Sequence, residues 1–165
     1  MTTIRFIPIF EDAEFIEATK EYEAIWEKEA NRIIEVFNKV TGLSLLENRI
    51  ACVVYEGMSM SGGTVNDLMK LRASYNSDEK KGTLVHELSH RLVLNIKNHP
   101  EDLNSHQVIY LFLYDTWIEL YGEEFAKKML EIEKRRTDMY KKAWEWAMSF
   151  SKQQRKQKFA DILSK

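Results

Sequence analysis

Apolar residues recur at helical spacing over the first long segment of the chain, from about Asp12 to Thr41. Steps of three and four residues place them on one side of a helix, and Gly42 marks its end. The pattern therefore predicts a long helix with one buried face. Its apolar positions are Phe15, Ala18, Tyr22, Ile25, Trp26, Ile33, Phe37 and Val40.

Three shorter segments predict β-strands, because they combine partial alternation with β-branched and aromatic residues. They are Thr3–Phe10, which should end near Pro8, then Arg49–Tyr55 and Met69–Tyr75. The glycine-containing residues 56–65 lie between the second and third strands and predict a turn-rich loop. The spacing of the glycines matches neither a P-loop nor a dinucleotide fingerprint, so we assign the loop no phosphate chemistry.

The rest of the chain predicts helices. One helix should cover about residues 77–98, with Ser77 and Asp78 available as N-cap residues. A second, apolar on nearly all sides, should cover about residues 104–121. One or two further helices should occupy residues 122–165.

Length and composition fit a single α+β domain over residues 1–165. Of the 165 residues 44% are hydrophobic, which is enough to bury a core and excludes wholesale disorder. No apolar run approaches the ~20 residues of a membrane span. The single Cys52 excludes a disulfide within the chain and a cysteine-rich zinc framework. Residues 1–10 do not read as a secretory signal, so we expect a cytoplasmic protein.

Charge is distributed unevenly along the chain. Residues 1–60 carry a net charge of −5 and residues 123–165 a net charge of +5, within an overall net charge of −2. We interpret the basic tail as the solvated face of a helix. The alternative is a nucleic-acid docking surface. It would consist of Lys152, Arg155, Lys156 and Lys158.

The motif with the clearest chemistry is His-Glu-x-x-His at residues 86–90. Residues four apart on a helix project from the same side, so the imidazoles of His86 and His90 can reach one Zn²⁺ ion. Glu87 is one residue further round the helix, beside the metal without ligating it. From there its carboxylate can accept a proton from a water molecule that the metal activates, and later pass the proton to a leaving amine.

These residues make the chain resemble the zincin metallopeptidases, whose active-site helix carries this motif. Thr83, Leu84, Leu88, Ser89 and Leu92 fit the extended consensus of the family, whereas Arg91 stands where an uncharged residue is usual. Val93 and Ile96 exclude the metzincin branch, so the chain resembles a minimal zincin.

The resemblance implies a fold over about residues 3–122, with residues 123–165 as a helical C-terminal extension. A long N-terminal backing helix, a small mixed β-sheet, the active-site helix and a helix with the third ligand should follow in that order. The resemblance also implies that His86 and His90 are zinc ligands and that Glu87 is the general base and acid. The strand Met69–Tyr75 would be the sheet edge that binds an extended peptide.

No family motif identifies the third zinc ligand, and we predict Asp115. It lies on an apolar helix, where a buried carboxylate needs a cation or several donors. If the active-site helix continues about two turns past His90 and the next helix returns antiparallel, a residue two to three turns into that helix comes level with the metal. Glu119 and His106 remain alternatives, although His106 lies in the first turn, which that geometry places too early.

We therefore expect a zinc-dependent peptidase that acts on a peptide or protein, contacts no membrane and has no nucleic-acid partner. The first alternative is a zincin-fold module that has lost activity and serves in binding or regulation. The second is a nucleic-acid-associated protease that docks through its basic C-terminal helix. The sequence does not indicate the substrate, the oligomeric state or the pathway.

Overall fold

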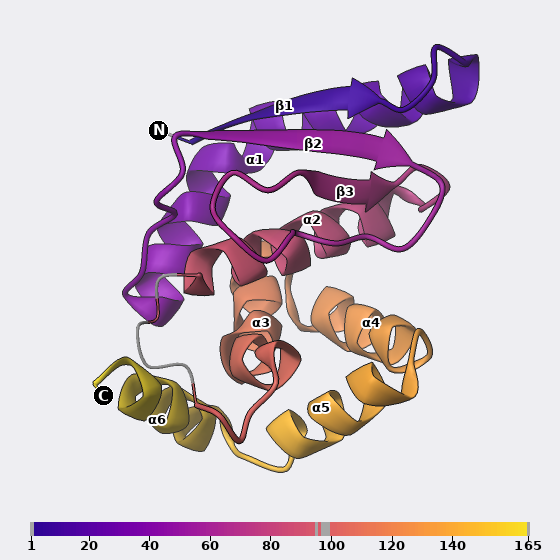
Figure 1. The fold of residues 1–165 in the computed structure, drawn as a ribbon. Coiled ribbons are helices and arrows are strands. Elements are labelled where there is room, and N and C mark those ends of the chain that lie inside the picture. Colours follow the sequence, from indigo (N-terminus) through magenta and orange to yellow (C-terminus); the bar gives the residue numbers. More distant parts are fainter. Residues whose placement is uncertain (1, 95, 97–99, 165) are drawn as a thin grey trace. The chain divides into compact units, whose positions relative to one another are not determined.

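The computed structural model describes residues 2–94, 96 and 100–164, and they form an α+β protein (Figure 1). Its contacts cluster into two compact units. Unit 1 comprises residues 1–35 and 43–94, and unit 2 comprises residues 36–42 and 95–165. The boundary between the units therefore differs from the predicted division into a core and an extension at residue 122.

Unit 1 contains a sheet of three strands in the order β1 (Thr3–Pro8), β2 (Arg49–Tyr55) and β3 (Met69–Arg72). Both pairs of neighbours are parallel. The expectation of a mixed sheet is therefore wrong. Helix α1 (Ala13–Thr41) and the loop after β2 each carry the chain back across the sheet, which a parallel neighbour requires.

Helices α1 and α2 (Ser77–Val93) lie on the same side of this sheet (Figure 1). The ring of Phe6 on β1 stacks on Tyr22 of α1, with 6.0 Å between ring centroids. The hydroxyl of Tyr22 donates to the carbonyl of Arg72 at 2.8 Å. At the centre of the sheet the inward-facing side chains form a buried layer: Phe6, Ile50, Cys52, Val54, Met69 and Leu71.

Strand β3 does not offer an open edge at its centre. The backbone of Lys70 donates to Met60 at 2.8 Å and accepts from it at 2.9 Å, which forms an antiparallel bridge. The N–H of Arg72 donates to the Ser59 hydroxyl at 3.1 Å. The loop after β2 thus occupies the edge that the resemblance assigned to a bound peptide, so that expectation needs correction.

Unit 2 is helical, with α3 (Ser105–Tyr121) packed against all three helices that follow it. These are α4 (Glu123–Lys134), α5 (Asp138–Met148) and α6 (Lys152–Leu163). One or two helices were predicted in the tail. The chain forms three because Thr137 and Ser151 each cap a new helix, accepting a hydrogen bond from a backbone N–H in its first turn.

Several predicted helix ends are confirmed, and one is not. Gly42 and Gly122, with φ of +74° and +90°, follow α1 and α3 as predicted. Helix α2 ends at Val93, earlier than predicted, and the predicted end at Asn98 lies outside the described residues. In the described part of the chain, no helix combines the length and apolar character needed to cross a membrane.

Candidate metal centre

Helix α2 carries the His-Glu-x-x-His motif, and its N-terminus is fixed by a capping box. The side chain of Asn76 accepts a hydrogen bond from the N–H of Glu79, and the Glu79 carboxylate accepts one from the N–H of Asn76. Ser77 and Asp78, predicted as N-cap residues, instead form the first turn. The prediction was one residue late because asparagine caps a helix as well as serine or aspartate does.

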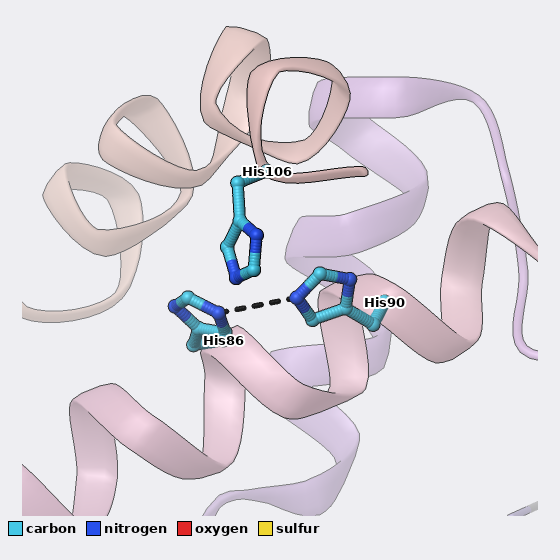
Figure 2. A group of neighbouring side chains, drawn as sticks. All are labelled: His86, His90 and His106. Carbon is cyan, nitrogen blue, oxygen red and sulfur yellow. Dashed lines mark hydrogen bonds between the residues drawn. The ribbon is translucent and has the colours of Figure 1, made fainter. Parts of the chain in front are cut away.

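The two histidines of the motif face each other on α2 (Figure 2). The Nε2 atoms of His86 and His90 lie 3.2 Å apart, and the ring centroids lie 5.1 Å apart. His86 is 1% exposed, whereas His90 is half-buried. The predicted four-residue spacing therefore brings two imidazole nitrogens to one point on the side of the helix.

This separation fits the edge of a tetrahedral zinc site. Two nitrogen ligands, each about 2.05 Å from a tetrahedral ion, lie about 3.3 Å apart. The Nε2 atoms of His86 and His90 differ from that value by about 0.1 Å at their separation of 3.2 Å. A direct hydrogen bond between the two rings would also give this distance, provided that one ring donates and the other accepts.

Glu87, the predicted general base, is buried, with 3% of its surface exposed. On the neighbouring strand β2, burial raises the pKa of the Cys52 thiol, and the negative charge of the Glu87 carboxylate raises it further. Cys52 is fully buried and stays protonated, so it behaves as a small core residue, as predicted.

Arg91, the departure from the family consensus, has a structural explanation. Its side chain is fully buried and its Nη1 atom lies 3.0 Å from the carboxylate of Glu47. The same nitrogen donates to the carbonyl of Thr64 at 3.1 Å, and Nη2 donates to the carbonyl of Asp67. Arg91 thus ties the loop before β3 to the helix that carries both histidines.

That loop is also braced from within. The carboxylate of Asp67 accepts from the N–H groups of Gly63 and Thr64, at 2.8 Å and 2.7 Å. These bonds hold the pKa of Asp67 below its usual value. The N–H of Asn66, a residue with φ of +72°, donates to Glu47 at 2.9 Å. The loop is therefore preorganised by polar contacts.

A third histidine, His106, belongs to unit 2, whereas His86 and His90 belong to unit 1. His106 lies in the first turn of α3, where its ring packs against Tyr140 and Tyr110 at centroid distances of 4.2 Å and 5.6 Å.

The expectation that His106 lies too early for the metal assumes that α2 continues about two turns beyond His90. The helix ends at Val93, within one turn. All four histidines of the chain lie between residues 86 and 106, a sequence signal that keeps His106 a candidate ligand. The fourth, His99, lies outside the described residues.

Asp115, the predicted third ligand, belongs to unit 2. It lies on α3 with 5% of its surface exposed, and its Oδ2 atom accepts from Nη2 and Nε of Arg155 at 2.8 Å and 3.2 Å. The buried carboxylate needs a cation, as predicted, but the cation in contact with it is a guanidinium from α6.

Glu119, the other acidic alternative, pairs with Lys39 at 2.6 Å. The hydrogen bond from Lys39 lowers the pKa of Glu119. In the described structure both acidic candidates on α3 therefore contact side-chain cations.

The basic helix α6 differs from the surface that nucleic-acid docking would need. Arg155 is 4% exposed and faces Asp115, so it does not contribute to a basic surface. Lys158 lies over the ring of Phe150 at 4.4 Å, and Lys152 and Lys156 are exposed.

The comparisons with known proteins provide no relative. No protein-family model matches the sequence, and no curated protein and no solved structure matches it significantly.

Proposed function

We propose that the protein is a zinc-dependent peptidase of minimal zincin type, with His86 and His90 as metal ligands and Glu87 as the general base. The observation that carries the proposal is the 3.2 Å separation of the two Nε2 atoms within a His-Glu-x-x-His helix. Neutral imidazole nitrogen is a preferred zinc ligand, so the donor set fits the metal chemically.

With one further protein ligand, these two histidines would leave a fourth tetrahedral position for water or substrate, as catalytic zinc sites require. A zinc ion held there would supply Lewis-acid activation of water and of the scissile carbonyl. Glu87 would accept the proton of the attacking water at a carboxylate oxygen as the new C–O bond forms. It would return that proton to the amine nitrogen as the C–N bond breaks.

A structural zinc site has no use for Glu87, which favours catalysis over a purely structural metal. We further propose that the protein acts in the cytoplasm, since its single cysteine is buried and suits a reducing compartment.

The first experiment measures zinc in the purified, zinc-loaded protein by elemental analysis. We expect about one zinc ion per chain in the wild-type protein and Glu87→Gln, and a loss of affinity above about 100-fold in His86→Ala and His90→Ala. Asp115→Ala is the matched control and should retain the metal. A protein without zinc, whose stability does not change with a chelator, would contradict the metal site.

The second experiment measures hydrolysis of a mixed peptide library by mass spectrometry. Glu87→Gln keeps the shape of the side chain and removes the base, so cleavage should fall by about 10² to 10⁴-fold while zinc content is unchanged. If the zinc-loaded wild type cleaves nothing and Glu87→Gln binds zinc equally well, the inactive binding module becomes the better description.

A further inference from the structure

The sheet of unit 1 has an uncovered face. Parallel sheets normally carry helices on both faces. Here α1 and α2 lie on one face (Figure 1), and the side chains that point the other way are exposed or half-buried in the described structure. We call this the outer face, and its central residues are Arg5, Ile7, Arg49, Val53, Met60 and Lys70.

The register places apolar groups at the centre of the outer face. Ile7, Val53 and Lys70 form one row across β1, β2 and β3. Met60 stands opposite Lys70, and residues directly opposite in an antiparallel pair share a face. Met60 is 44% exposed, and Ile7 and Val53 are half-buried. This apolar surface has no covering element among the described residues.

Cations surround that centre without balancing acids. Arg5 and Arg49 are exposed, and Lys70 is half-buried. Among the described residues none of these three forms an ion pair, whereas Arg72 on the same face pairs with Glu56. Glu56 balances Arg72 on this face, so the charges of Arg5, Arg49 and Lys70 leave the outer face locally positive.

Two kinds of anionic partner could bind this positively charged face: a single-stranded nucleic acid or an acidic polypeptide. The aromatic residues of the face distinguish between them. Single-stranded nucleic acid binds sheets through aromatic rings that stack on bases. Tyr55 is the one aromatic residue of these strands on the outer face, and its hydroxyl donates to the carbonyl of Met58. Its ring lies 5.9 Å from the ammonium group of Lys70. It therefore offers little stacking surface.

We propose that the outer face is a docking surface for a partner polypeptide segment that carries both acidic and apolar side chains. The apolar centre would be covered by its apolar residues, and Arg5, Arg49 and Lys70 would pair with its carboxylates. Binding at this face requires neither zinc nor Glu87. The inference is therefore independent of the proposed peptidase activity.

The test uses the full-length protein, both zinc-loaded and chelator-treated, and a fluorescein-labelled twelve-residue peptide of alternating Leu and Glu. Fluorescence anisotropy should show binding to both forms that weakens as salt rises from 50 to 500 mM, because salt screens exposed charges. A peptide of alternating Leu and Lys should not bind.

The critical variant is Arg5→Glu/Arg49→Glu/Lys70→Glu, which should weaken binding of the Leu-Glu peptide about tenfold or more. The matched control is Lys20→Glu/Lys141→Glu/Lys142→Glu, which makes the same change of net charge at exposed positions and should bind like the wild type. The milder Arg5→Gln/Arg49→Gln/Lys70→Gln variant tests whether misfolding explains the loss of affinity. It should bind the peptide more weakly while its melting temperature is unchanged.

Four results would overturn the proposal. They are equal losses of affinity in the critical and control variants, equal binding of the Leu-Lys peptide, and tighter binding of an oligothymidylate that the critical variant abolishes. The fourth is self-association of the wild type that the critical variant removes, which would make a second copy of the chain the occupant.

Discussion

Helices α2 and α3 make an informative pair because they are so alike in outline. Each has 17 residues, begins with an asparagine in a capping box and is mostly buried. They differ in what they bury. Helix α3 buries aliphatic and aromatic side chains with Asp115 and Thr116, whereas α2 buries a run of polar groups. These are Lys80, Thr83, His86, Glu87, Ser89 and Arg91.

The two helices show that a buried charge does not by itself identify a metal site. Asp115 on α3 and Arg91 on α2 both have a protein counter-ion, Arg155 and Glu47 respectively. Both are structural ion pairs. The spacing of His86 and His90 predicts a contact directly, because it places both side chains on one side of the helix, and their Nε2 atoms lie 3.2 Å apart.

The two buried ion pairs can be compared by breaking each one. The larger loss of stability is expected from Arg91→Met. The substitution leaves the Glu47 carboxylate, 3% exposed, without its guanidinium and removes two bonds to the loop before β3. We expect a loss of about 3–5 kcal/mol in the free energy of unfolding. Denaturant titration measures the loss, and hydrogen exchange should show faster exchange at residues 62–68.

The double variant Glu47→Leu/Arg91→Met is its control. Removal of both charges should recover most of the stability, because no buried charge is left alone. If Arg91→Met alone is as stable as the wild type, Arg91 does not hold the loop.

The second prediction concerns Arg155→Met, with a loss of about 3 kcal/mol, the low end of the range for a broken buried pair. The effect is smaller because Lys152 remains 3.9 Å from the Asp115 carboxylate. Zinc content per folded molecule should not change. Release of zinc by Arg155→Met or Asp115→Asn, without unfolding, would restore Asp115 as a ligand candidate.

The third prediction compares the two helix caps. Asn76→Ala and Asn104→Ala should each cost about 1 kcal/mol, because each leaves a backbone N–H in the first turn without its side-chain acceptor. Thermal unfolding measures both. A serine at either position should recover most of the loss. A much larger loss at Asn76 than at Asn104 would show that the cap of α2 also supports the candidate site.

The smallest effect is expected from pH. The N–H groups of Thr64 and Gly63 hold the pKa of Asp67 below its usual value. Asp67 therefore stabilises the loop above the ordinary carboxyl pKa of ~3.9, and this contribution is lost as pH falls through the lower pKa of the folded state. Limited proteolysis within residues 62–68 should increase in acid. In Asp67→Asn the cleavage rate should be raised at neutral pH and change less with acid.

Local signals in the sequence predicted much of the fold. Most bounds of α1, β2 and α3 follow from apolar periodicity, from β-branched residues and from the glycines at 42 and 122. The His86–His90 pair follows from the helical repeat alone. The parallel sheet does not, because strand direction depends on how the chain crosses the sheet between strands. The breaks between α4, α5 and α6 were not predicted, although the residues that cap the later two helices, Thr137 and Ser151, are local signals in the sequence.

By itself, then, the sequence determined the helix that carries His86, Glu87 and His90, because the spacing that joins those side chains is contained within five residues. Only the tertiary structure decided the partners of Asp115, Glu119 and Arg91. The counter-ion of Asp115 is 40 residues away, and that of Arg91 is 44 residues away. A charge pattern along the chain does not encode which of many distant groups comes within hydrogen-bonding distance, because that choice depends on the packing of whole helices and loops.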